Sequence, residues 1–394
     1  MTIAAPEPTG AGSAHQTASR PPPWRDVRYL SWAFQAAVVG GLIAFVLWIG
    51  ENLDANGLEL DYGYLDRQAG FPIADSDFRL TQPVSDALLE GLANTGRLVV
   101  AGVLLATVLG TLIGIARLSQ NFLLRTAAQW YVEVIRNVPL YGIFLIMYSG
   151  VALQVLPHPR EPLDWSGVLY ASTRGVAIPW YEASNVRFAV LVLIVIVVFV
   201  GAFTLFTKAT DRTGTPYPTL TIAVLGGLAA LVLGWIILGL GVTAPERQGL
   251  RASGGITMTL AYFAALASLV LYTSSHVAEI VRGSIQAVSK GQGEAASALA
   301  LSGVQRMRFV VLPQAMRIAL PSIGNQYLNL AKNSSLAAVV TLPELTKITQ
   351  LAIANQSGPP VPALFLLLGI YLCISLTLSL IVNVLNRRLR IVER

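Results

Sequence analysis

The stretch EAASALALSGVQRMRFVVLP, residues 294–313, is an island of polar and small residues between long apolar segments. Helical spacing would give its first half a small-residue surface that a partner backbone can approach closely, built from Ala295, Ala296, Ala298 and Ala300. Glu294, Arg306 and Arg308 supply charge at the rim of this surface. A docking surface for another protein is the favoured interpretation, and an ordinary amphipathic loop is the alternative.

The composition around this island is that of a membrane protein. Hydrophobic residues make up 54% of the chain and charged residues 12%, with a mean hydropathy of +0.61. Soluble domains carry about 25% charged residues. The fold class predicted is therefore all-α, a polytopic membrane protein. The single cysteine, Cys373, lies in an apolar run, so no disulfide can form within the chain.

Long apolar stretches recur along the sequence. A helix needs about 20 mostly apolar residues to cross a bilayer, and about eight stretches meet that requirement. They lie near 30–50, 92–116, 137–156, 187–207, 219–243, 256–280, 318–342 and 362–385. Residues 1–28 are rich in Ala, Pro, Ser and Thr, and we expect a disordered cytoplasmic tail there, followed by one transmembrane domain over 29–394.

The placement of basic residues predicts the orientation. If the termini lie inside the cell and the spans alternate, most Lys and Arg residues fall on the inside, and most acidic residues fall in the outer segments. The positive-inside rule then places both termini and the loop around Glu294 in the cytoplasm. The two long outer segments, 51–90 and 157–186, carry aromatic residues suited to a membrane interface.

The island resembles the EAA loop of ABC importer permeases. That family's pattern is Glu-Ala-Ala, three residues, Gly, nine residues, Ile, one residue and Leu-Pro. The matching residues here are Glu294, Ala295, Ala296, Val310 in place of Ile, Leu312 and Pro313. The family Gly position holds Ala300, and a left-handed conformation costs alanine about 1 kcal/mol. We therefore expect the helix to end about one turn later, at Gly303.

The resemblance implies the architecture and the partners. It indicates a type I ABC importer permease core over about 85–156 and 255–390, with the EAA loop over about 283–315. It implies that this loop docks onto ABC ATPase subunits in a bacterial inner membrane, beside a second permease subunit in what is expected to be a heterodimer. It also implies an extracytoplasmic amino-acid-binding protein that delivers substrate. No nucleic-acid partner is expected.

A second polar island lies inside a predicted span. Residues 324–336 read GNQYLNLAKNSSL, and the KNSSL part resembles a string in permeases for polar and general L-amino acids. Asn325, Asn329 and Lys332 fall on one helical face, where Lys332 is suited to pair with a substrate carboxylate. Asn333 and Ser334 add neutral hydrogen-bonding groups. The alternative is that these side chains form interhelical hydrogen bonds in a subunit interface.

Further charged residues lie near predicted helix ends. Arg97, about one turn inside the second stretch, is a candidate substrate residue, although it could instead reach the outer headgroups. Glu133 and Arg136 are spaced to pair with each other, as are Glu279 and Arg282. We expect these two pairs to be structural.

The sequence lacks the motifs that would indicate nucleotide binding, metal binding or catalysis. No Gly-x-x-x-x-Gly-Lys-(Ser/Thr) loop occurs, so ATP is expected to bind to partner subunits and this chain to hold no cofactor. No metal site or nucleophile–base pair stands out, so the chain is not expected to be an enzyme. Two alternatives to an ATP-driven permease remain, an ion-coupled secondary amino-acid transporter and a non-transporting scaffold subunit.

Overall fold

The structure is a computed structural model that describes residues 27–55, 60–74, 76–182, 185–213, 217–355 and 357–389. The predicted tail over 1–28 lies almost entirely outside these residues. The chain divides into two units, 1–62 and 63–394. The described part of the first unit is mainly one helix, α1 (Val27–Ala55), which carries the first predicted span.

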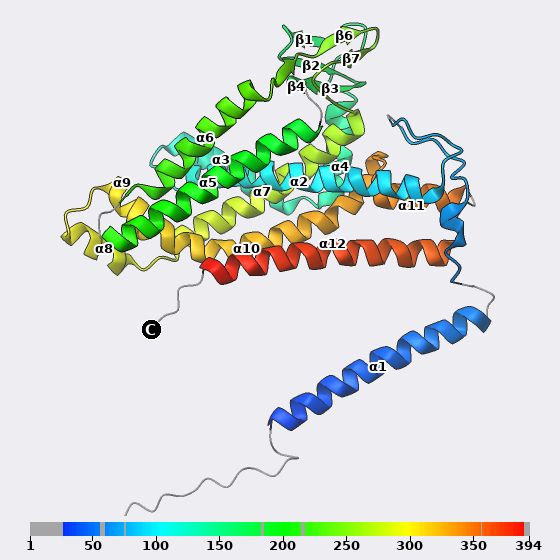
Figure 1. Ribbon diagram of the computed structural model, residues 1–394, viewed down its shortest axis with the longest axis horizontal. Helices are drawn as coiled ribbons and strands as arrows, with labels where there is room; N and C mark the ends of the chain where they lie inside the picture. The colour runs from blue at the N-terminus through cyan, green and yellow to red at the C-terminus, as the bar shows by residue number, and fades with distance from the viewer. Residues whose placement is uncertain are drawn as a thin grey trace, which may run out of the picture. The chain divides into compact units, whose positions relative to one another are not determined.

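The second unit is mostly helical (Figure 1). Its helices and helical turns are η1 (Gly63–Asp66), α2 (Val84–Ala116), α3 (Phe122–Asn137), α4 (Leu140–Leu145), η2 (Ile146–Ala152), α5 (Asn185–Thr213), α6 (Thr219–Ile237), α7 (Leu260–Gln286), α8 (Lys290–Ala298), α9 (Gly303–Arg306), η3 (Met307–Val311), α10 (Leu312–Asn333), η4 (Ser334–Val340), α11 (Leu345–Ala354) and α12 (Pro360–Leu389). Its strands are β1 (Leu163–Trp165), β2 (Leu169–Ser172), β3 (Gly175–Ile178), β4 (Trp180–Glu182), β5 (Gly241–Thr243), β6 (Glu246–Gln248), β7 (Arg251–Ser253) and β8 (Ile256–Met258).

Helices α2 and α7 form the centre of this unit and pack along each other. Glycine permits their close approach, because a Cβ added at Gly110 would lie 2.7 Å from the Cβ of Val277. Gly114 is equally confined, with the carbonyl oxygen of Ala278 2.8 Å from the position of an added Cβ. Helix α10 packs on both α7 and α12, and α10 and α12 run side by side in Figure 1. Small residues thus replace bulky ones where helices meet, as membrane packing favours.

Among the described residues, five helices are long and apolar enough to cross a membrane, and the number rises to seven if each of two bent pairs is one span. One pair joins α3 to α4 and η2 with a bend of 106°, and the other joins α9–η4 to α11 with a bend of 46°. Each of the eight predicted stretches coincides with a helix or part of a bent pair. The apolar part of α6 covers only Thr221–Ile237, so α6 falls short of the length test.

The second outer segment, predicted as a loop, forms short strands together with residues that precede α7. We call strands β1–β8 the cap; they gather at the upper right of Figure 1. Four of them form the antiparallel sheet β1-β2-β3-β8, in which Val176 pairs with Met258. Strand β4 pairs with β5, which closes the outer end of the α5–α6 hairpin. The fold class is therefore mainly α, with a small β addition. Strands β5 and β8 take up the end of the predicted stretch 219–243 and the start of the predicted stretch 256–280.

The first outer segment folds against the helices. Tyr64 and Phe71 are buried in a cluster with Val84 of α2 and with Leu345 and Ile348 of α11. A Cβ at Gly91 would lie 2.9 Å from Cγ1 of Ile348, so α2 and α11 approach closely. Burying the side chains of these aromatic residues stabilises the outer end of the helices by about 2–3 kcal/mol for each of them.

Candidate functional site

The predicted docking loop is built from α8, α9 and η3. Figure 1 shows α8 and α9 at the end of the helices opposite α11. Helix α8 contains Glu294, Ala295 and Ala296, and it ends at Ala298. Ala296 is buried, whereas Glu294 and Ala295 are exposed. The alanine face thus divides into one residue that anchors the helix and others that stay open to a partner.

The end of α8 corrects the expectation for Gly303. Ala300 itself takes the left-handed conformation, with φ 55°. The amide of Leu301 donates to the carbonyl of Ala296 at 3.1 Å, and the amide of Ala300 donates to the carbonyl of Ser297 at 2.9 Å. These two bonds form a Schellman motif, which satisfies the last carbonyls of the helix and offsets the strain at Ala300. Gly303 instead begins α9.

Side chains hold the rest of the loop in place. The hydroxyl of Ser302 accepts from the amide of Gln305 at 3.3 Å, and the Gln305 side chain accepts from the Ser302 amide at 2.9 Å, so α9 begins with a capping box. Arg306 donates to the hydroxyl of Ser297 at 3.1 Å and ties α9 to α8. Leu312 and Pro313 lie exposed in the first turn of α10, where proline needs no amide donor.

Large apolar side chains stand exposed on this polar loop. Leu299 and Val304 are each 77% exposed, and Phe309 is 62% exposed. A loop predicted to lie in water gains nothing from such exposure, and exposed apolar patches mark interaction sites. The sequence analysis named none of these residues. The sequence feature that could have identified them is the presence of large apolar residues between polar neighbours in a segment too polar to span a membrane.

The predicted substrate residues of α10 fall on one exposed face. Asn325, Asn329 and Lys332 are all exposed, Asn333 is half-buried, and Ser334 is buried with its hydroxyl donating to the carbonyl of Ala331 at 2.7 Å. The first three therefore form a polar stripe along a helix whose sequence lies in a span. Such side chains are unfavourable against lipid, so a cavity or another helix must cover them.

The opposite face of α10 is packed. A Cβ at Gly324 would lie 2.3 Å from Cγ1 of Val382, so this glycine lets α12 come into contact. Leu330 is fully buried next to Gly102 of α2. The hydroxyl groups of Tyr327 and Thr107 lie 2.6 Å apart. This packing fixes the rotation of α10 and so the direction of the polar stripe.

Arg97 lies elsewhere, in the first half of α2. It is exposed and donates to Oδ1 of Asn94 at 3.0 Å, and Asn94 in turn donates to the carbonyl of Pro343 at 3.0 Å. The amide of Leu345 donates to the hydroxyl of Thr95 at 3.1 Å. Arg97 is thereby fixed beside the bend between η4 and α11. Within the described residues, no hydrogen bond or ion pair joins it to Lys332.

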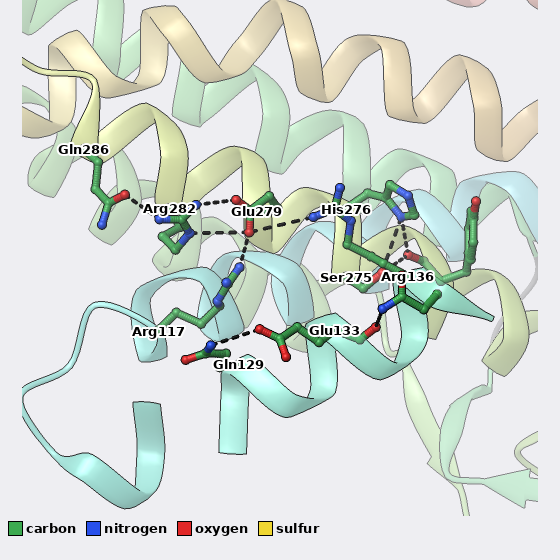
Figure 2. Close-up of polar contacts among 11 residues, drawn as sticks. Arg117, Gln129, Glu133, Arg136, Ser275, His276, Glu279, Arg282 and Gln286 are labelled. Atoms are coloured by element: carbon green, nitrogen blue, oxygen red, sulfur yellow. Dashed lines mark hydrogen bonds and ion pairs between the residues drawn. The ribbon is translucent and has the colours of Figure 1, made fainter. Parts of the chain in front are cut away.

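A cluster of arginines surrounds Glu279 on α7 (Figure 2). Arg117 and Arg282 both pair with its carboxylate, and Nη1 of Arg136 lies 3.9 Å from Oε2. The predicted pair of Glu279 and Arg282 is confirmed. The predicted pair of Glu133 and Arg136 is wrong, because Glu133 accepts from Gln129 at 2.9 Å and Arg136 turns toward Glu279. The cluster joins α2, α3 and α7, which is a structural role.

Glu344 is a buried acid that the sequence analysis missed. It is 0% exposed and caps α11, where its carboxylate accepts from the amides of Thr346 at 2.9 Å and Lys347 at 2.8 Å. The hydroxyl of Tyr371 on α12 also donates to it at 2.9 Å. The Pro-Glu-Leu sequence at the start of α11 could have indicated this role of Glu344, since an acidic residue at this position favours a helix start.

Comparison with known proteins supplies the identity of this architecture. The family described as binding-protein-dependent transport system inner membrane component matches residues 102–391. The chain is 36% identical over 381 residues to the general L-amino acid transport system permease protein AapQ of Rhizobium johnstonii, covering 94% of each chain. It is 34% identical over 376 residues to the putative amino-acid ABC transporter permease protein YhdX of Escherichia coli, covering 92% of this chain and 95% of that one.

The name of a third relative gives its substrates. The glutamate/glutamine/aspartate/asparagine transport system permease protein BztB of Rhodobacter capsulatus is 32% identical over 419 residues, covering 94% of this chain and 96% of that one. These matches extend over the cap and the α5–α6 hairpin as well as the core. The chain is therefore a multi-pass membrane protein that belongs to the family of inner membrane components of binding-protein-dependent transport systems.

Proposed function

We propose that this chain is the permease subunit of an ATP-driven importer for polar or general L-amino acids. The names of its full-length relatives support this substrate class. The polar stripe of Asn325, Asn329 and Lys332 supports it chemically, because an amino acid offers a carboxylate to the lysine and polar groups to the amides. Asn333 and Ser334, which follow Lys332, and Arg97, in the first half of α2, are further candidates.

The exposed apolar side chains of the docking loop are the observation that carries the proposal. Leu299 directly follows the helix that holds Glu294, Ala295 and Ala296, and Val304 lies in α9. A partner ATPase subunit would cover Leu299 and Val304, together with the turn from Ala300 to Gly303 and the segment at Leu312 and Pro313. ATP would bind in that partner, and this chain would hold no cofactor and catalyse no reaction.

Force would reach the helices through the loop. Closure of the ATPase pair would move α8, and the covalent step from η3 into α10 would carry that motion to the polar stripe. Such a pathway is a two-state element that ATP and the loaded binding protein both bias. A second permease subunit, in a heterodimer, would cover the exposed face of α10, so the substrate path would lie between the subunits.

The orientation belongs to the same proposal. With both termini in the cytoplasm, the docking loop meets the ATPase and the cap faces the binding protein on the outside. A reporter domain fused after Arg394 should then be active only in the cytoplasm. An external reporter signal would reverse the loop and cap and would contradict the proposal.

Transport assays test the function itself. The complex is purified with its partners and reconstituted into vesicles with the binding protein, and uptake of labelled L-glutamate, L-glutamine and L-histidine is followed. Uptake of at least one of these amino acids should require ATP on the cytoplasmic side. Uptake driven by a proton or sodium gradient in the absence of ATP would identify a secondary transporter instead. Failure of all three amino acids to enter under either condition would support the scaffold alternative.

A further inference from the structure

The cap contains a cavity at the start of α7. Its volume is about 210 Å³, and strands β2, β3, β7 and β8 contribute to its walls. The polar side chains that line it are Tyr170, Arg174, Arg251, Thr257 and Thr259. A Cβ at Gly175 would lie 2.5 Å from the carbonyl oxygen of Met258, so β3 and β8 are held in direct contact at this point. The cavity is therefore part of the folded sheet.

Tyr170 leaves a polar group without a partner beside this cavity. The residue is 1% exposed, and its hydroxyl is buried without a hydrogen bond to any part of the chain that the structure describes. A buried hydroxyl that stays unpaired is destabilising, so a native protein usually supplies a partner. Tyr170 is one of the residues that line the cavity, and we infer that a ligand there is the partner of its hydroxyl.

The electrostatics of the cavity favour an anion. Among the residues that the structure describes, Arg174 and Arg251 both line it, and no acidic side chain does. It also lies at the N-terminus of α7, a helix of 27 residues whose positive end attracts negative charge. The hydroxyl of Thr259 accepts from the amide of Tyr262 at 3.0 Å and so fixes this helix start.

These observations point to one ligand chemistry. Guanidinium groups and a phenol hydroxyl are the donors that bind carboxylates. Because no acidic side chain lines the cavity, the ammonium group of a neutral amino acid would lack a charged partner there. We propose that the cavity of the cap binds a carboxylate carried by a ligand of net negative charge. Its two possible sources, a free acidic amino acid and an acidic side chain of the binding protein, follow from the proposed function.

Direct binding to the purified complex tests the first source. L-Glutamate is titrated by calorimetry in detergent without the binding protein, and L-glutamine serves as the neutral isostere. We expect glutamate to bind more tightly than glutamine, and Arg174→Gln to weaken glutamate binding by about tenfold or more. Tyr170→Phe should cause a loss of several-fold while keeping the ring in the core. Arg160→Gln, at an exposed arginine of the cap outside the cavity lining, should change nothing.

A second variant distinguishes glutamate binding at the cap from glutamate binding in the transport pathway. Lys332→Ala alters the proposed substrate residue of α10, so binding that persists in Lys332→Ala and disappears in Arg174→Gln belongs to the cap. Loss of uptake in Lys332→Ala with intact glutamate binding would support the site in the cap. It would do so independently of how substrate passes along α10.

The second source is tested with the binding protein itself. If free glutamate does not bind, the affinity of the complex for the binding protein should fall by about tenfold in Arg174→Gln and stay unchanged in Arg160→Gln. That result would assign the carboxylate to an acidic side chain of the binding protein. If neither glutamate binding nor binding-protein affinity depends on Arg174, Arg251 and Tyr170, the proposal is wrong.

Discussion

The amide of Leu301 donates to the carbonyl of Ala296 at 3.1 Å and closes the C-terminus of α8 over a left-handed alanine. This bond lies at the turn that joins α8, the helix that carries Glu294, to the segment that carries Val304. The exposed side chain of Leu299 belongs to the same turn. Its geometry requires φ 55° at Ala300, a conformation that glycine adopts more easily than alanine.

Ala300→Gly should therefore stabilise the loop. Relief of the left-handed strain is worth about 1 kcal/mol, which corresponds to about a fivefold slower hydrogen exchange of the Leu301 amide. Hydrogen–deuterium exchange with mass spectrometry of the purified complex measures this change. Gly303→Ala is the control, because Gly303 lies in a helix and nothing stands within 4 Å of an added Cβ. Faster exchange in Ala300→Gly would show that the Schellman motif does not form.

Leu299→Asp should weaken the complex with the ATPase. Placing a carboxylate where an apolar side chain is covered removes the contact and buries a charge, so we expect at least a tenfold loss of ATPase co-purification. Quantitative pull-down from detergent extracts gives this ratio. Leu163→Asp is the matched control, since Leu163 is 52% exposed on β1 of the cap. Equal recovery of the ATPase with both variants would remove the role assigned to Leu299.

Glu294→Lys reverses the charge at the rim of the same surface. Glu294 is exposed and tolerates the change without loss of packing, so the permease itself should accumulate normally. ATP-driven uptake should fall sharply, because a like-charge contact at an interface costs several kcal/mol. Unchanged uptake together with unchanged ATPase binding would show that Glu294 does not face the partner.

Lys332→Ala should impair uptake without preventing assembly. The side chain is exposed on α10, so its loss should spare the fold. A pairing of the ammonium group with the substrate carboxylate is worth about 1.5–3 kcal/mol, so uptake should drop by at least tenfold. Lys347→Ala, on α11, is the lysine control. Normal uptake in Lys332→Ala would leave the polar stripe with a purely structural role.

Glu279→Gln should destabilise the C-terminal parts of α2, α3 and α7. It leaves Arg117 and Arg282, both largely buried, without their anion, and the cost should be on the order of 2 kcal/mol, between exposed and fully buried pairs. A lower thermal midpoint of the purified complex measures this loss. Glu133→Gln should have little effect, because Glu133 is exposed and its carboxylate accepts from Gln129, outside the arginine cluster. Equal midpoints for the two variants would contradict the cluster assignment.

The sequence predicted the helices well, because apolar runs of about 20 residues have few alternatives to a membrane helix. It also singled out the loop from Glu294 to Pro313, since the spacing of its motif is local; the docking role of that loop stays a prediction. The cap was not predictable, because each strand has only three or four residues and Val176 finds its partner at Met258, far along the chain. The bend before α11 was missed for a similar reason, since Thr341 takes φ 62° without a glycine to mark it.

Side-chain pairing was predictable only at short range. The spacing of Glu279 and Arg282 within one helix predicted the correct pair. Arg136 instead lies near the carboxylate of Glu279 on another helix, and not near that of Glu133 one turn away. The polar stripe of α10 followed from helical periodicity, and its residues are exposed along one face. That a cavity or a partner covers this face stays a prediction. Its role in binding substrate stays a prediction, as does the role of Arg97.

Cross-linking at Leu299 tests most directly whether the loop of α8 and α9 grips the ATPase in the cytoplasm. The variant combines Leu299→Cys with Cys373→Ser, so that the chain carries one reactive thiol. A bifunctional thiol–amine reagent should then link this chain to the ATPase, and an impermeant thiol reagent added outside intact cells should leave the cysteine unlabelled. Labelling from outside, with no linked ATPase, would contradict the account.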